Sequence, residues 1–298
     1  MSEPQPGTAR PLPADDHVHT QWSWDTDVGS MAGTCARALD LGLPSVSFTE
    51  HVDATSWRVM PGVHDHLPAD WLEYVDGDVF TPPPLDLEGY LASVEECRDR
   101  FPSLRIRTGA ELSEPHWHVT YTTDFLQRSG VDRVLASLHS SPTTDESEHH
   151  ESPDPAHVEL SAKYSFETAE TVVRDYLAEI VRMIEGFDGF EVLAHIDYPL
   201  RYWPHEQRPF DPFAFEDEFR DALGALARSG RLLELNTKLP MQPQIVRWWH
   251  DAGGEGLSFG SDAHEPGNLA RGFRDAMAVA EAAGFRGGHD PLDFWHRA

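Results

Sequence analysis

The chain has 298 residues, of which 40% are hydrophobic, and its 51 acidic and 23 basic side chains give a formal net charge of −28. This length can hold one large barrel or two ordinary domains. Nucleic acid is not expected as a partner, because so acidic a surface repels a phosphate backbone. No run of eighteen apolar residues occurs, so no membrane span is expected either. The two cysteines, Cys35 and Cys97, fall in helical patterns, which favours reduced thiols and a cytoplasmic location.

The beginning of the chain differs in composition from the remainder. Residues 1–14 are rich in proline and lack the pattern of a signal peptide, so we expect a flexible N-terminal tail. Short apolar segments and helical patterns then alternate, which favours one domain over residues 15–298. The expected strands are residues 15–20, 44–51, 105–112, 132–139, 190–197, 231–237 and 257–264. The expected helices are residues 30–42, 85–101, 117–129, 165–187, 213–229, 241–253 and 268–284.

This alternation predicts the fold class. Seven strands, each followed by a helix, indicate an α/β protein with a parallel sheet and right-handed crossovers. Because nothing marks a second domain, we expect the sheet to close into a barrel. An open doubly wound sheet is the alternative, although no glycine-rich dinucleotide-binding fingerprint follows the first strand.

Two connections are unusually long for a compact domain. They span residues 53–84 and 140–164, and both follow the C-terminal end of a strand, where the active-site loops of barrels lie. Residues 53–84 contain several aromatic side chains, so we expect a lid-like insertion and not simple disorder. Residues 140–164 are acidic and are expected to be partly mobile.

Residues of the types that bind metals recur at the ends of six of the seven strands. They are His17, His19, His51, Glu111, His139, His195, Asp262 and His264. Asp25, six residues after His19, extends the set. Parallel strands present their C-terminal ends on one face, so we expect these groups to converge, and burying them there without partners would be costly. Nitrogen and oxygen donors without thiolates suit Zn, Fe or Mn. Nine donors are too many for one ion and favour two or three ions, bridged by Glu111.

The motifs that carry these residues resemble, in order, those of the PHP family, the polymerase and histidinol phosphatase metal-dependent hydrolases. They are DDHVHT, SFTEHVD, GAEL, SLHS, LAHIDYP and SFGSDAH. The resemblance runs from Asp16 to about His264 and implies a distorted (β/α)7 barrel with a trinuclear metal site. By matching motif, the first ion would bind His17, His19, Glu111 and Asp262. The second ion would bind Asp25, His51 and His264, and the third would bind Glu111, His139 and His195. Catalytic roles are implied for Glu111, Asp262 and His264.

The resemblance also implies a reaction. An aspartate at position 25 and the stretch ELNTKLP are similar to the histidinol-phosphatase branch of the family. We therefore expect a phosphomonoesterase that converts L-histidinol phosphate to L-histidinol and phosphate, by attack of a hydroxide that bridges two metal ions. Arg201 and Lys238, beyond the fifth and sixth strands, are candidates to bind the phosphate. The alternatives are a phosphatase for another small ester, such as a nucleotide or sugar phosphate, and a non-catalytic metal-binding barrel.

Overall fold

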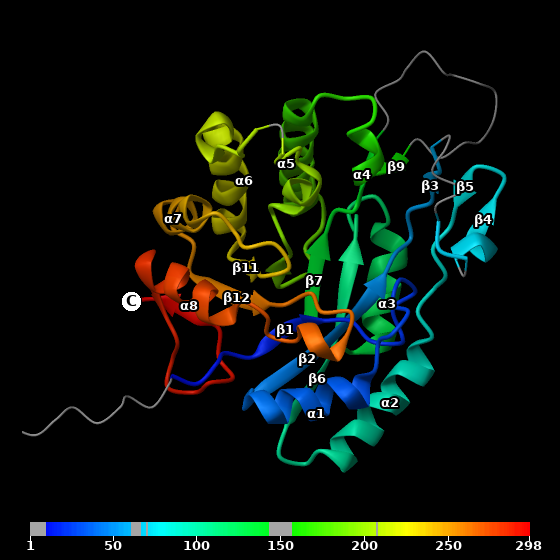
Figure 1. The fold of residues 1–298 in the computed structure, drawn as a ribbon, viewed down its shortest axis with the longest axis vertical. Coiled ribbons are helices and arrows are strands. Elements are labelled where there is room, and N and C mark those ends of the chain that lie inside the picture. The colour runs from blue at the N-terminus through cyan, green and yellow to red at the C-terminus, as the bar shows by residue number, and fades with distance from the viewer. Residues whose placement is uncertain (1–9, 61–66, 70, 143–156, 207) are drawn as a thin grey trace, which may run out of the picture.

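A nine-stranded sheet lies at the centre of the molecule, in the computed structural model that describes residues 10–60, 67–69, 71–142, 157–206 and 208–298. Its order is β1-β2-β6-β7-β10-β11-β12-β14-β13, and neighbouring strands from β1 to β12 are parallel (Figure 1). All seven predicted strands are present. They are β1 (Asp15–Val18), β2 (Ser45–Val52), β6 (Arg105–Ser113), β7 (Arg133–Ser137), β10 (Val192–Leu193), β11 (Leu232–Asn236) and β12 (Gly256–Gly260).

Helices are arranged around these strands (Figure 1). They are α1 (Met31–Leu41), α2 (Leu87–Arg100), α3 (Val119–Ser129), α4 (Leu160–Lys163), α5 (Ala169–Gly186), α6 (Glu216–Ser229), α7 (Pro243–Asp251) and α8 (Phe273–Ala282). Seven of them match the predicted helices, and α4 was not predicted. Helix α1 begins where the Ser30 hydroxyl accepts a hydrogen bond from Gly33 N and ends at Gly42, whose φ of 69° suits a residue without a side chain. Among the described residues, no helix is both long and apolar enough to cross a bilayer.

The sheet curls until its first and last parallel strands meet. Asp262 N donates a hydrogen bond of 2.8 Å to His17 O, and His19 N donates one of 2.9 Å to Ala263 O. These bonds join the C-terminal ends of β1 and β12, which an open doubly wound sheet does not do. The α/β class and the curled parallel sheet are confirmed, and a complete barrel of seven strand–helix units stays a prediction. Beyond β12, the sheet continues with two short antiparallel strands that were not predicted, β13 (Phe285–Arg286) and β14 (Trp295–Arg297).

The two long connections pair with each other in a second, five-stranded sheet of order β4-β5-β3-β9-β8. Residues 53–84 contribute β3 (Trp57–Arg58), β4 (Val75–Asp76) and β5 (Val79–Phe80), and residues 140–164 contribute β8 (Ser140–Pro142) and β9 (His157–Glu159). Arg58 and Val158 pair in parallel at the junction. The expectation of mobility in 140–164 falls mainly on residues 143–156, which lie outside the described residues. The lid role of 53–84 stays a prediction.

The segment expected to be a flexible tail is packed in its last part. Residues 1–9 lie outside the described residues, but Leu12 and Ala14 are buried, and Arg10 forms an ion pair with Glu281 near the end of α8. The packed fold therefore begins before residue 15.

Tyr90 connects α2 to the sheet through a fully buried hydroxyl. This hydroxyl donates 2.7 Å to Phe48 O on β2 and accepts 2.8 Å from Gly109 N on β6. We predict that Tyr90→Phe lowers the free energy of unfolding by about 1–3 kcal/mol, because Gly109 N–H then lacks an acceptor in the core. Urea denaturation measures this, with Tyr121→Phe on the exposed side of α3 as the control. Equal stability of the two variants would contradict the role of Tyr90.

Candidate metal centre and active site

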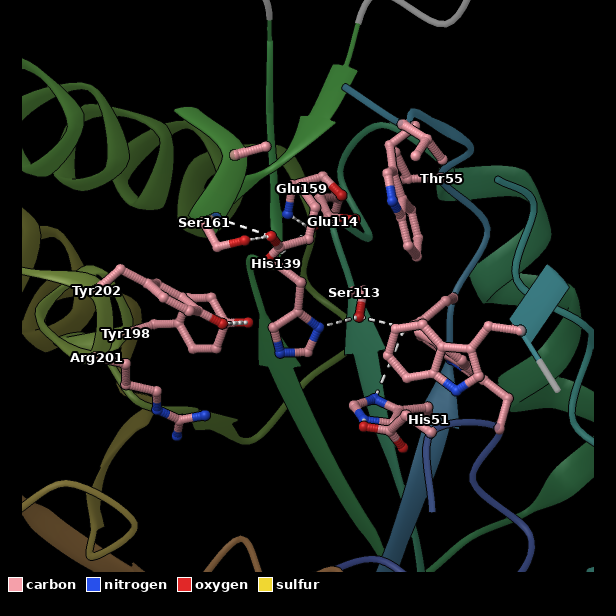
Figure 2. A pocket seen from close by; sticks show the side chains of 18 of the residues that line it. His51, Thr55, Ser113, Glu114, His139, Glu159, Ser161, Tyr198, Arg201 and Tyr202 are labelled. Atoms are coloured by element: carbon pink, nitrogen blue, oxygen red, sulfur yellow. Dashed lines mark hydrogen bonds and ion pairs between the residues drawn. The ribbon is translucent and has the colours of Figure 1, made fainter. Parts of the chain in front are cut away.

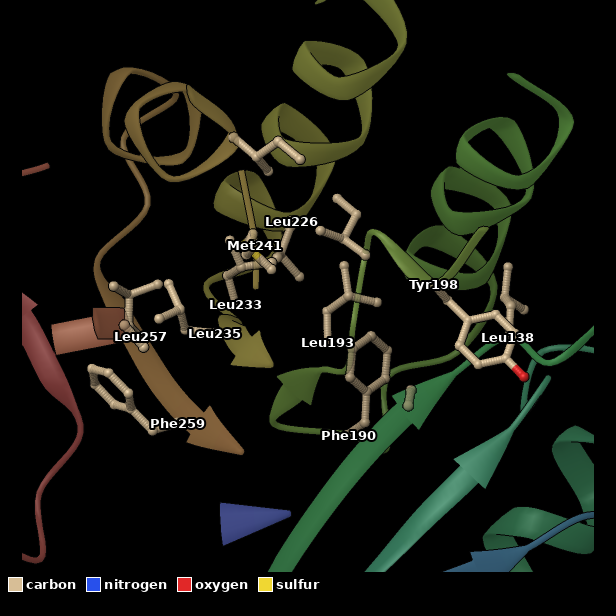
Figure 3. Packing of buried hydrophobic residues seen from close by; sticks show 14 of the residues in the cluster. Leu138, Phe190, Leu193, Tyr198, Leu226, Leu233, Leu235, Met241, Leu257 and Phe259 are labelled. Carbon is tan, nitrogen blue, oxygen red and sulfur yellow. The ribbon is translucent and has the colours of Figure 1, made fainter. Parts of the chain in front are cut away.

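A cavity of about 720 Å³ opens at the C-terminal ends of the parallel strands, between them and the small sheet (Figure 2). Six of the nine donor residues line it, namely Asp25, His51, Glu111, His139, Asp262 and His264. The other three, His17, His19 and His195, are at most 1% exposed and contact Glu111. The nine side chains therefore form one contiguous cluster, drawn from strands that span almost the whole sequence.

Glu111, near the end of β6, is the centre of this cluster. Its Oε1 atom lies 2.8 Å from His195 Nε2 and 3.5 Å from His139 Nε2. Its Oε2 atom lies 3.2–3.3 Å from ring nitrogens of His17, His19 and His51. Burial disfavours the charge of this carboxylate, but the neighbouring imidazoles of His17 and His139 outweigh burial and hold its pKa well below the usual range. Glu111 is therefore an ionised carboxylate shared by five imidazoles.

Asp25 gathers the donors on the outer side of the cluster. Its Oδ2 atom lies 2.9 Å from His264 Nε2 and 3.4 Å from His51 Nε2. Its Oδ1 atom is buried and has no hydrogen-bond partner among the described residues. Burial opposes the charge on His51, but Asp25, Asp53 and Glu111 raise its pKa to about 10. An ion that binds the His51 nitrogens must therefore displace a proton at neutral pH.

Asp262 joins the cluster from the segment that directly follows β12, the last parallel strand. Its Oδ1 atom lies 3.6 Å from His19 Nε2 and 3.5 Å from His264 Nδ1. Its backbone has a φ of 51°, a conformation that few residues other than glycine adopt and that asparagine and aspartate tolerate best. The two predicted phosphate-binding cations contact the same carboxylate. Arg201 Nη2 lies 2.6 Å from its Oδ2 atom, and Lys238 Nζ lies 3.2 Å from its Oδ1 atom.

The donor atoms are close enough together to share metal ions. Four groups each offer ligand atoms within 4.8 Å of one another, namely His19/His51/His264, His17/Glu111/His195, His17/His19/Asp262 and His51/Asp53/His139. A zinc ion about 2.0–2.2 Å from each nitrogen or oxygen fits between atoms at such separations. His51 Nδ1 also has no hydrogen-bond partner in the described part of the chain, as expected of a nitrogen suited to a metal. The site therefore fits divalent metal ions.

Sequence reasoning missed Asp53, which forms a group with His51 and His139. Its Oδ2 atom accepts a 2.7 Å hydrogen bond from Trp24 Nε1, and its Oδ1 atom accepts one from the Ser113 hydroxyl. Ser113 Oγ lies 2.9 Å from His139 Nδ1, so these contacts orient the imidazole of His139. The signal in the sequence was the spacing, because Asp53 follows His51 by two residues and lies on the same side of an extended chain.

Glu234, in the middle of β11, was also missed. It is fully buried, and its Oε1 atom lies 2.6 Å from His17 Nδ1 while its Oε2 atom accepts 2.8 Å from His195 N. It thus fixes the ring of His17 and the backbone of His195, as residues behind metal ligands do. A Cβ atom at Gly260 would lie 1.9 Å from Glu234 Oε1, so only glycine leaves room for this pair. A glutamate inside the apolar stretch RLLELNT was the available signal.

The parallel sheet is curled, and imidazoles and carboxylates gather at the C-terminal ends of its strands. This combination is typical of metal-binding proteins with a barrel-like α/β fold. The PHP domain model matches residues 15–238, and the chain belongs to that family.

Curated relatives and a solved structure extend the similarity to almost the full length. The chain is 23% identical over 279 residues to a histidinol-phosphatase of Lactococcus lactis, covering 91% of both chains. It is 26% identical over 281 residues to a probable histidinol-phosphatase of Deinococcus radiodurans, covering 90% of this chain and 91% of that one. A crystal structure of the Lactococcus lactis histidinol phosphate phosphatase complexed with Zn, L-histidinol and phosphate has a TM-score of 0.73 at 21% identity. That match covers 96% of this chain and 99% of the other.

We predict that Glu234→Gln weakens zinc binding by about 10–100-fold, because a neutral amide holds His17 and the backbone of His195 less firmly. Competition with a chelator, followed by metal analysis, measures the change. Glu185→Gln, on the exposed face of α5, is the control. Zinc affinity equal to that of the unchanged protein would show that Glu234 does not support the metal ligands.

Proposed function

We propose that this protein is a metal-dependent phosphatase that hydrolyses L-histidinol phosphate to L-histidinol and phosphate. The observation that carries the proposal is the cluster around Glu111, which joins donors from six strands beneath one cavity. Family membership over residues 15–238 supports a metal-dependent hydrolase. The full-length similarity to proteins named histidinol-phosphatase supports this substrate over other phosphate esters.

The proposal includes two or three divalent ions, with Zn, Mn or Fe as candidates. The ligand sets are those that the resemblance to the PHP family implies, namely His17/His19/Glu111/Asp262, Asp25/His51/His264 and Glu111/His139/His195. When bound, such ions lower the pKa of a water nucleophile and neutralise charge on the phosphate. Glu111, Asp262 and His264 would hold these ions at the cavity wall, next to the substrate. Asp53 is an additional candidate ligand beside His51 and His139.

Arg201 is positioned to bind the phosphate. Its side chain is 16% exposed and lines the cavity, and its guanidinium packs 4.7 Å from the centre of the Tyr198 ring. This packing keeps the charged fork beside Asp262, so a phosphate there can take two parallel hydrogen bonds. Lys238 is 42% exposed on the same side and adds a second, less constrained charge. Both cations are therefore assigned to the phosphate end of the substrate.

Three further features of this protein belong to the proposal, namely the type of barrel, the role of residues 53–84 and the cellular location. A distorted (β/α)7 barrel is supported by the hydrogen bonds between β1 and β12. A covering role for residues 53–84 is supported by two observations. Three of its segments are strands of the five-stranded sheet, and Trp57 and Trp71 line the cavity together with the metal cluster. The two buried cysteines are consistent with the cytoplasmic location expected from the sequence.

Phosphate release from a panel of esters tests the proposal. The protein is loaded with Zn, Mn or Fe and offered L-histidinol phosphate, nucleoside monophosphates and sugar phosphates. We expect the highest kcat/KM for L-histidinol phosphate with at least one of the metals. Hydrolysis of nucleotides or sugar phosphates without turnover of histidinol phosphate would replace this function by the alternative phosphatase. Tight metal binding without any turnover would indicate the non-catalytic barrel.

We predict that Arg201→Ala retains its metal content but lowers kcat/KM for histidinol phosphate by about 100-fold, because a charge-assisted contact to phosphate is lost. Steady-state kinetics and metal analysis on the same preparation measure both quantities. Arg228→Ala, on the exposed end of α6, is the control. Unchanged kcat/KM in Arg201→Ala would remove this residue from the phosphate site.

A further inference from the structure

The wall of the cavity that carries Glu114 and Glu159 has the opposite charge to the wall that carries Arg201. Figure 2 shows Glu159 and Glu114 together above the ring of His139, with Arg201 and His51 below it. All five residues line the same cavity. A molecule held there meets cationic side chains at one end and carboxylates at the other.

The carboxylates of Glu114 and Glu159 differ in their hydrogen-bond partners. Glu114 is 1% exposed, and its Oε1 atom accepts hydrogen bonds from His139 N (2.6 Å) and Ser140 N (2.8 Å). Its role is thus to fix the backbone beside a metal ligand. Glu159 is only half-buried, and among the described residues its Oε2 atom accepts hydrogen bonds from the backbone N–H and the hydroxyl of Ser161, in the first turn of α4. Glu159 is therefore the carboxylate with capacity left for a ligand.

In the part of the chain that the structure describes, Glu159 forms no ion pair with a lysine or arginine, and the imidazole of His139 is its charged neighbour. Three of the nearby cations are engaged elsewhere, because Lys163 pairs with Asp175 at 2.7 Å, and Arg201 and Lys238 both contact Asp262. A carboxylate that lines a cavity without a lysine or arginine partner favours a positively charged ligand group there.

The backbone holds Glu159 close to the metal cluster. Glu159 and Ser140 are register partners in the antiparallel pair β8–β9, and Leu160 N donates a 2.8 Å hydrogen bond to His139 O. The residue is therefore one strand away, about 5 Å between backbones, from the segment that carries His139. This short reach matters because only two carbon atoms separate the ester oxygen of histidinol phosphate from its ammonium nitrogen.

We infer that Glu159 is a specificity-determining residue whose carboxylate binds the ammonium group of an amino-alkyl phosphate while the phosphate lies at the metal cluster. This inference rests on the proposed function and assigns the recognition of its substrate. Tyr198 and Tyr202, whose hydroxyls lie 3.2 Å apart, line the same cavity. The carboxylate thus distinguishes phosphate esters whose alcohol part carries an ammonium group from esters whose alcohol part is uncharged.

The test compares histidinol phosphate with phenyl phosphate, which has no cationic group. Glu159→Gln and Glu159→Ser both remove the charge, and the serine hydroxyl keeps a cap for the N–H of Ser161, so at least one variant retains α4. We expect the ratio of kcat/KM for histidinol phosphate to that for phenyl phosphate to fall about tenfold or more, mainly through KM. Glu159→Asp should recover part of the ratio, and Glu88→Gln, exposed on α2, should match the unchanged protein.

Failure of the inference about Glu159 can be distinguished from failure of the proposed function. A ratio within twofold of the unchanged protein in folded, metal-loaded Glu159→Gln or Glu159→Ser would overturn the inference and leave Glu159 as a helix cap, with the proposed function intact. Absence of histidinol phosphate turnover in the unchanged protein, with phenyl phosphate hydrolysed, would overturn both.

Discussion

The structure depends on one buried anion, the carboxylate of Glu111, and on the five imidazoles that surround it. Burying a charge costs several kcal/mol of free energy unless partners compensate. Here the partners are imidazoles, and burial also disfavours the protonated, charged form of an imidazole. Their protonation states differ accordingly. The pKa of His17 is raised well above its usual value, because nearby carboxylates overcome burial. The pKa of His19 is lowered well below it by burial and by the charges on His51 and His264. Divalent cations bound to these side chains would resolve this conflict by taking the place of the protons.

The parallel sheet is what makes such a cluster possible. Six of the seven parallel strands deliver donors at the same edge, although His17 and His264 lie almost 250 residues apart in the sequence. The residues behind the donors complete the arrangement. Glu234 fixes His17, Ser113 contacts His139, and the absence of a side chain at Gly260 leaves space for Glu234. The precision of the site is therefore set by side chains that would not bind metal themselves.

Much of the fold and of the donor cluster was predictable because both follow short-range rules. Alternating strand and helix patterns indicated the parallel sheet, and strand ends indicated where the nine donors gather. The missed features depend on long-range contacts. The pairing of Arg58 with Val158 joins segments 100 residues apart and has no local signature. Glu234 was missed because a mid-strand glutamate is recognisable as a partner of His17 only when β1 and β11 are placed in one sheet. The C-terminal strands β13 and β14 are too short for a periodic pattern.

The central claim is that Glu111 lies among two or more metal ions. Anomalous diffraction at the absorption edge of zinc, on crystals of the zinc-loaded protein, tests it most directly. The account predicts at least two peaks, each within coordination distance of Glu111 and of imidazoles from different strands. One peak away from Glu111, or zinc bound only at surface side chains, would contradict it.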